Sequence, residues 1–189
     1  MRHKYETHGL VLARMHMGEA NTAITFLTPD LGLVHARAQG LRNTGAKLAS
    51  SLATLTESRV VLVRGKEGWR VTGAVLEENW FARLPEAAPR ERLARVTGLL
   101  LRLVAGETQD SELFPVVKAF FVALATLPED RHEAVEILAV LRILASLGFD
   151  TGEIPEDTAL FSAFSFAEII ENRAGYIARI NNGIAASEL

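Results

Sequence analysis

The stretch PDLGLVHARAQG, residues 29–40, contains a tight turn followed by the clearest strand of the chain. Proline and glycine at residues 29–32 favour a reverse turn. From Leu33 to Gln39 small or apolar side chains alternate with polar ones, which is the pattern of a strand with one face in a core. The apolar segment Thr22–Thr28 precedes the turn, so the two segments predict an antiparallel hairpin.

Three more segments have the composition of short strands: Gly9–Met15, Arg59–Val63 and Arg70–Leu76. The chain thus has five expected strands in its first 80 residues, with a longer connection between the third and the fourth. This arrangement predicts a five-stranded Greek-key barrel of the OB type. The number of strands also allows an SH3-like barrel.

After Pro85 the apolar residues recur at the spacing of helices. Helices are expected over 93–104, 113–124 and 128–147, and a last one from about Ser165 that Gly175 interrupts. The sequence therefore predicts an α+β protein, in which an N-terminal OB-fold nucleic-acid-binding domain (residues 1–80) is followed by an α-helical domain (residues 81–189).

The two predicted domains differ in charge. Residues 1–80 contain ten Lys and Arg against seven Asp and Glu, a net charge of +3, whereas residues 81–189 carry −6. A basic half points to a polyanion such as nucleic acid. The chain has no cysteine, which excludes disulfides, thiolate nucleophiles and cysteine-ligated metals. It shows no signal peptide and no apolar run of the ~20 residues that cross a membrane, so we expect a cytoplasmic protein without membrane partners.

Cationic residues gather in two places of the predicted barrel. Residues 64–70, RGKEGWR, form the turn between the fourth and fifth strands, a loop that contacts nucleic acid in OB-folds. There Trp69 is expected either to stack on a base or to fold back on the barrel. The outward side chains of the third strand continue into the loop after it. The predicted DNA-binding residues are Arg14, His35, Arg37, Arg42, Lys47, Arg64, Lys66, Trp69 and Arg70.

Catalytic and metal-binding patterns are weak. The five histidines, His8 and His16 among them, have no compact set of ligand spacings, and the paired carboxylates stand at the ends of elements. The carboxylates of the basic half are too scattered for a nuclease that needs magnesium. We therefore expect no metal, no cofactor and no enzymatic activity.

An ordered series of residues resembles the bacterial RecO family of DNA repair and recombination proteins. The positions that carry the resemblance are Gly9–Leu12, Gly18–Ala20, Phe26–Thr28, Gly32, Ala38–Arg42, Arg64, Gly65, Leu147 and Gly148. The resemblance implies an OB-fold with a helical domain and binding of single- and double-stranded DNA. It also implies annealing of complementary strands, and partnership with RecR and single-stranded-DNA-binding protein in loading RecA, in a nucleoid-associated protein of the cytoplasm.

Two features depart from that family. Many members carry a four-cysteine zinc module in the C-terminal half, which this short chain lacks, and Gln39 stands where lysine is common. An alternative function is a protein–protein adaptor whose barrel is only a scaffold. In that case phenylalanines of the helical half would line a groove for an apolar peptide: Phe120, Phe121, Phe161, Phe164 and Phe166.

Overall fold

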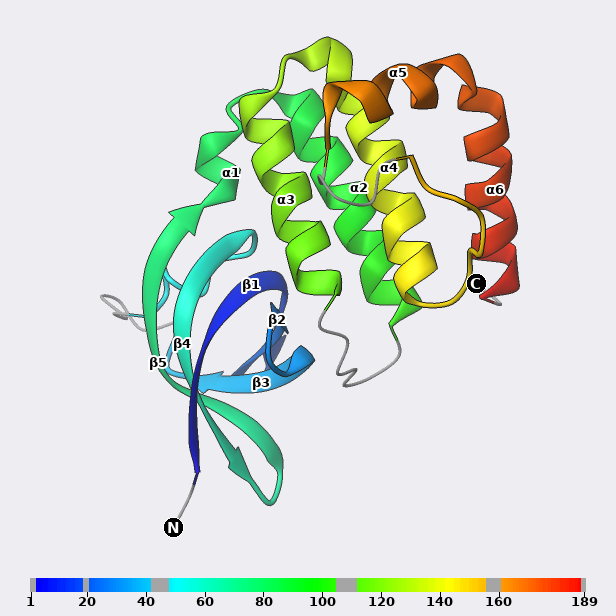
Figure 1. Cartoon of the computed structure of the whole chain (residues 1–189). Coiled ribbons are helices and arrows are strands. Elements are labelled where there is room, and N and C mark those ends of the chain that lie inside the picture. The colour runs from blue at the N-terminus through cyan, green and yellow to red at the C-terminus, as the bar shows by residue number, and fades with distance from the viewer. Residues whose placement is uncertain (1–2, 19–20, 42–47, 105–111, 156–160, 188–189) are drawn as a thin grey trace. The chain divides into compact units, whose positions relative to one another are not determined.

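The computed structural model describes residues 3–18, 21–41, 48–104, 112–155 and 161–187. Its N-terminal part is a closed barrel of five strands (Figure 1). The strands are β1 (Lys4–Met17), β2 (Asn21–Thr28), β3 (Gly32–Gln39), β4 (Thr56–Gly65) and β5 (Gly68–Asn79). They follow the order β1-β2-β3-β5-β4, and β4 closes the barrel against β1. The pairing of β3 with β5 is parallel and the others are antiparallel. The predicted OB-fold is confirmed.

Strand β1 is longer than the predicted segment Gly9–Met15, because it starts at Lys4. Its first half pairs with β4, from Lys4 opposite Val63 to Leu10 opposite Glu57, and its second half pairs with β2. The residues at its start are polar and exposed. Such residues give no hydrophobic periodicity, so pairing with a distant strand, rather than local pattern, extends β1.

The barrel core confirms the alternation of the third strand. Val34, Ala36 and Ala38 point into the core, and the residues between them point outward. Other core side chains come from β1, β2, β4, β5 and the connection after β3, among them Val11, Ile24, Phe26, Leu52, Leu62 and Val71. Gly9 is needed beside this core, since a Cβ there would lie 2.9 Å from Cδ1 of Phe26.

The chain divides into two compact units, the first with residues Met1–Arg83 and Val104–Phe114, the second with Leu84–Leu103 and Pro115–Leu189. A short helix, α1 (Trp80–Arg83), follows the barrel. The other helices are α2 (Ala87–Leu103), α3 (Leu113–Thr126), α4 (His132–Ser146, after a 3-10 turn at Glu129–Arg131), α5 (Ala163–Glu171) and α6 (Arg173–Ala186). In the second unit α4 contacts α2, α5 and α6, and most of its side chains are buried.

The expected interruption of the last helix lies at a different residue. Gly175 was expected to break it, but Gly175 lies inside α6, and the break falls at Asn172, between α5 and α6. Asn172 has φ −109° and ψ 32°, which is not helical. A glycine within a helix costs about 1 kcal/mol relative to alanine, a penalty that the packing of α6 against α4 can offset.

Candidate nucleic-acid interface

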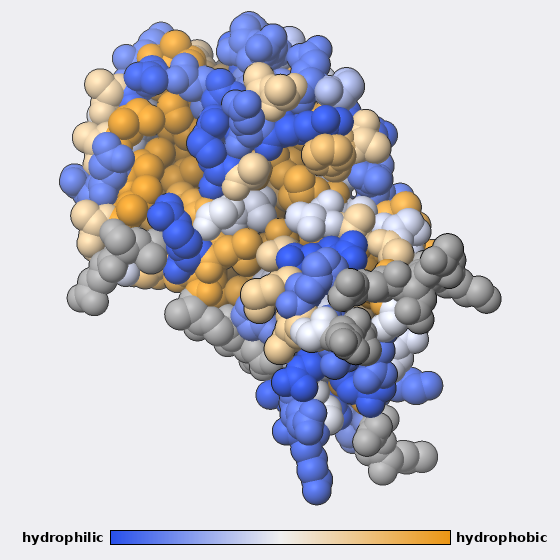
Figure 2. Space-filling model, turned by 180° about the vertical axis from the view of Figure 1, so that it is seen from behind, coloured by the Kyte–Doolittle hydropathy of each residue, from blue (hydrophilic) through white to orange (hydrophobic). Residues whose placement is uncertain are grey.

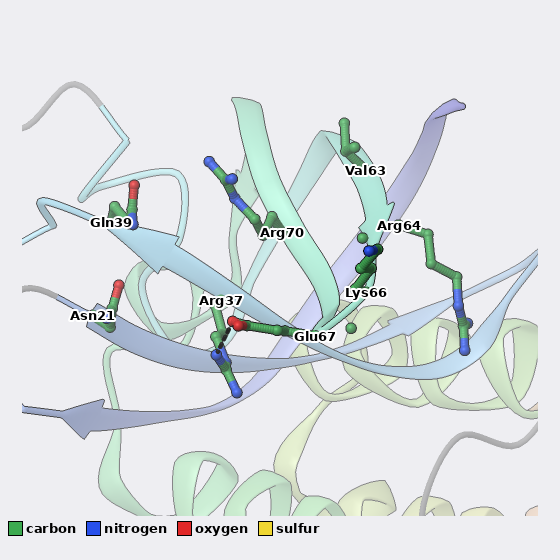
Figure 3. A pocket seen from close by; sticks show the side chains of 10 residues that line it. Asn21, Arg37, Gln39, Val63, Arg64, Lys66, Glu67 and Arg70 are labelled. Carbon is green, nitrogen blue, oxygen red and sulfur yellow. Dashed lines mark hydrogen bonds and ion pairs between the residues drawn. The ribbon is translucent and has the colours of Figure 1, made fainter. Parts of the chain in front are cut away.

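A groove of about 670 Å³ lies on the first unit, beside the turn between β4 and β5. Four cationic side chains line it together with one carboxylate and two amides: Arg37, Arg64, Lys66, Arg70, Glu67, Asn21 and Gln39. Figure 3 shows these side chains around the β4–β5 hairpin and along β3. In OB-folds the β2–β3 face and the loops β1–β2 and β4–β5 bind oligonucleotides. The groove takes residues from β2, β3 and the β4–β5 turn, and also from the ends of β4 and β5 that flank this turn.

The strand register explains why the cations meet. Arg37 on β3 is the direct partner of Arg70 on β5, and Arg70 is also the partner of Val63 on β4. Directly opposed residues share one face of a sheet. Arg37 and Arg70 therefore both project from the outer face, as their exposure confirms. Lys66 joins them from the two-residue turn between Gly65 and Gly68, whose φ of +100° suits glycine.

Glu67 places a negative charge among these cations. Its Oε2 accepts a hydrogen bond from Nη1 of Arg37 at 3.3 Å, and the two side chains are turned toward each other in Figure 3. The Glu67 side chain is 85% exposed. Exposed ion pairs contribute at most about 1 kcal/mol. A phosphate can therefore replace this carboxylate beside Arg37 at small cost.

Of the two orientations expected for the Trp69 indole, the structure has the one that folds back on the barrel, so the ring is not exposed for stacking on a base. Trp69 is 5% exposed and belongs to the barrel core, opposite the small side chain of Ala36. Trp69 and Arg70 are consecutive residues of β5, so their side chains lie on opposite faces of the strand, and that of Trp69 points inward. The ring packs edge-on against Tyr5, with 5.1 Å between ring centroids, and the guanidinium of Arg64 lies 4.9 Å from the indole centroid. Tyr5 is 41% exposed and is the accessible ring of this cluster.

Two of the remaining predicted residues, His35 and Arg14, lie away from the groove. His35 projects outward from β3, as predicted, and its Nδ1 lies 3.0 Å from the hydroxyl of Thr25. Arg14 is half-buried on β1 opposite Ile24. Neither residue lines the groove. Arg42 and Lys47 lie outside the described residues.

Two amide residues of the groove were not among the predicted DNA-binding residues. Asn21 and Gln39 are register partners on β2 and β3, and their amides add uncharged hydrogen-bonding groups to the groove. The sequence pattern could have indicated Gln39, because it follows His35 and Arg37 in the outward-facing row of β3. Asn21 offered no signal, because its place beside Gln39 comes from the hairpin register.

The barrel end that carries the start of β1 and the β4–β5 hairpin is hydrophilic on the face seen in Figure 2. The groove itself contains no histidine and one carboxylate, so its described side chains do not form a metal site. A cluster with metal-binding groups lies instead on β1, β4 and β5, at His8, Glu57 and Glu77.

Among the described helices, none combines the length and apolar character that crossing a bilayer requires.

Known proteins resemble this chain along much of its length. Residues 1–79 match the family model described as "Recombination protein O N terminal". The chain is 32% identical over 145 residues to the DNA repair protein RecO of Heliobacterium modesticaldum, covering 77% of this chain and 52% of the relative. The RecO of Thermobifida fusca is 29% identical over 150 residues, which cover 77% of this chain and 60% of the relative. The RecO of Acetivibrio thermocellus is 23% identical over 194 residues, which cover 95% of this chain and 76% of the relative. The chain thus spans about half the length of the Heliobacterium relative.

Proposed function

The chain belongs to the RecO family, and on that premise we propose that it binds single- and double-stranded DNA without sequence preference and anneals complementary strands in recombinational repair. The convergence of Arg37, Lys66 and Arg70 in one groove of an OB-fold supports this proposal above any other observation. In this proposal residues 1–80 act as the DNA-binding domain and residues 81–189 as the helical domain. No turnover chemistry is required.

The groove suggests how strands are held. Guanidinium and ammonium groups neutralise phosphates, which lowers the repulsion between two strands and releases counterions. Arg37 and Arg70 act as a pair on neighbouring phosphates, and Lys66 adds a third charge from the turn. Because these groups contact the backbone rather than base edges, binding tolerates any sequence. Tyr5 provides the ring on which a base of a single strand stacks, a contact worth about 1–3 kcal/mol.

The proposed partners follow from the family. We propose that the chain acts in the cytoplasm, at the nucleoid, with RecR and single-stranded-DNA-binding protein, and that it assists the loading of RecA at gaps. The groove carries DNA in this scheme. Partner proteins are expected on the helical unit, which carries the acidic half of the sequence.

A binding and annealing experiment tests the proposal. The variant Arg37→Ala/Lys66→Ala/Arg70→Ala is compared with Arg59→Ala/Arg131→Ala/Arg173→Ala, which removes the same charge from exposed ion pairs elsewhere. Fluorescence anisotropy with a labelled oligonucleotide at several salt concentrations gives affinity and salt slope. We expect the first variant to lose annealing and to reduce the slope by about 2, at ~0.7 per phosphate contact for single strands. Equal behaviour of the two variants would remove the groove from the binding site.

A second candidate function, the adaptor, has one observation in its favour. An apolar groove of about 440 Å³ lies in the second unit, lined by Pro115, Ala119, Val122 and Phe161 among others. The other described phenylalanines of the predicted groove, Phe120, Phe121 and Phe166, are buried in the core instead, and Phe164 lies outside the described side chains. Val122→Glu would abolish partner binding and leave DNA affinity intact if this groove docks a partner. A chain that binds partners but no DNA would favour the adaptor.

A further inference from the structure

Two exposed methionines lie on the strand that borders the cationic groove. Met15 and Met17 belong to β1 and are 65% and 40% exposed. Apart from Met1, they are the only methionines of the chain. Single exposed apolar residues are ordinary on a protein surface. These two, however, alternate along one strand, so their side chains stand next to each other on the same face.

One row of the barrel surface joins Met17 to the groove. Met17 is the register partner of Asn21 on β2, and Asn21 is the partner of Gln39 on β3. Both amides line the groove, and Figure 3 shows them next to each other. Directly opposed residues share one face of a sheet. Met17 therefore continues the surface of the groove by one strand beyond its lining.

A second row joins Met15 to the cations. Met15 is the partner of Ala23 on β2, and Ala23 is the partner of Arg37 on β3. Arg70 follows on β5 as the partner of Arg37. Neighbouring strands are about 4.8 Å apart, which puts the backbones at Met15 and Arg37 about 10 Å from each other. Because only the small side chain of Ala23 stands between them in this row, one ligand can contact the thioether and the guanidinium together.

This combination selects a ligand with anionic groups and flat apolar rings. An unpaired DNA strand has both, since its phosphates are charged and the faces of its bases are free. In a duplex the bases are stacked on each other, and only the phosphates and base edges can be reached. The thioether of methionine is polarisable and flexible, and it makes favourable contacts with aromatic rings of different shapes. Such contacts fit binding that tolerates any sequence.

We propose that Met15 and Met17 bind the bases of a single DNA strand whose phosphates lie on Arg37 and Arg70. The inference rests on the proposed function, because it takes the cationic groove as the site of the sugar-phosphate backbone. It adds the physical basis of a preference for unpaired strands. The cations bind any DNA backbone, whereas the two thioethers bind only where base faces are accessible.

Affinity measurements with matched variants test the site. Met15→Thr/Met17→Thr retains every charge and introduces residues that favour strands. The control, Val75→Thr/Leu76→Thr, removes two apolar side chains of β5 that are 66% and 39% exposed and lie outside the groove. We expect the methionine variant to bind a labelled single strand about three- to tenfold more weakly, with unchanged duplex affinity and salt slope. The control should bind both DNA forms like the unaltered chain.

Methyl spectra of the unaltered chain make the test independent of folding in the variants. With ¹³C-methyl-labelled methionine, the signals of Met15 and Met17 are assigned from Met15→Leu and Met17→Leu. A single-stranded oligonucleotide should shift both signals upfield, because the ring currents of bases act on methyl groups that lie over their faces. A duplex of the same length should leave the two signals in place.

The outcomes separate this inference from the proposed function. If the unaltered chain binds DNA but the two methyl signals do not move, or the folded threonine variant keeps its single-strand affinity, the methionine site is wrong and the groove stands. An equal loss on duplex DNA also overturns the site. Signals that shift only with RecR or single-stranded-DNA-binding protein overturn it in favour of a partner protein. If the unaltered chain binds no DNA, the proposed function and this inference both fail.

Discussion

Arg37 and Arg70 are register partners across the parallel pairing of β3 and β5, although they come from distant parts of the chain. Two positive side chains directly opposed on a sheet repel each other. Glu67, at the β4–β5 turn, is paired with Arg37 and offsets part of this repulsion. The repulsion between Arg37 and Arg70 thus persists in part in the groove, and a bound polyanion would reduce it.

Removal of the Glu67 charge should tighten DNA binding. Because Glu67 occupies Arg37, Glu67→Gln frees that guanidinium for a phosphate, and we expect the affinity for a labelled single strand to rise about two- to fivefold. Anisotropy at low salt measures it. Glu6→Gln removes the same charge from an exposed position of β1 outside the groove. An equal gain in both variants would reflect net charge alone and contradict the specific competition.

Arg70→Thr should stabilise the barrel while it weakens DNA binding. The substitution removes the repulsion with Arg37 and introduces a residue that favours strands. We expect the free energy of unfolding to rise by about 0.5 kcal/mol without DNA, measured by urea titration. Arg59→Thr breaks an ion pair with Glu77 instead and should give no gain. A loss of stability in Arg70→Thr would show that the repulsion is already compensated.

Substitutions of Trp69 and Tyr5 should have different effects, the first on the stability of the barrel and the second on DNA binding. Trp69→Ala removes a core side chain and is expected to cost about 3–5 kcal/mol of unfolding free energy. Tyr5→Ala removes an exposed ring, so we expect a folded protein that binds single-stranded DNA more weakly and duplex DNA nearly as before, because duplex bases are already stacked. Chemical denaturation and anisotropy measure the two effects. Equal losses on both DNA forms would exclude stacking on Tyr5.

Tyr176 should make the helical unit sensitive to alkali. Burial, followed by its 2.6 Å hydrogen bond to Glu168, raises the pKa of Tyr176 to about 12 from an ordinary value of 10.0. The folded state therefore holds the phenolic proton more tightly than the unfolded state. The resulting stabilisation is complete below about pH 10 and is lost as the pH rises toward 12.

Urea titrations at pH 9 and pH 11 check this dependence. The fall in unfolding free energy between the two pH values should shrink in Tyr176→Phe, which has no proton to lose. Tyr5→Phe, in the barrel, should keep the fall of the unaltered chain. If Tyr176→Phe keeps it as well, other groups account for the alkaline instability.

The sequence by itself determined the class of fold and the excess of positive charge in residues 1–80. The alternation from Leu33 to Gln39, the helical spacing after Pro85 and the excess of cations in residues 1–80 are local properties of the chain. Composition and the spacing of apolar residues along the chain do not depend on contacts between distant segments, so the linear sequence contains them in full. The outward direction of His35, Arg37 and Gln39 followed from the same pattern.

Only the tertiary structure decided which of these residues lie together. The β3–β5 pairing put Arg70 beside Arg37, and strand parity put Trp69 into the core next to Ala36 instead of on the surface. A β-bulge at Glu77 in the β4–β5 ladder places this residue beside His8, a contact that no sequence spacing indicates. Register and bulges arise from packing between segments far apart in the chain, and a shift of one residue exchanges the inner and outer faces of a strand.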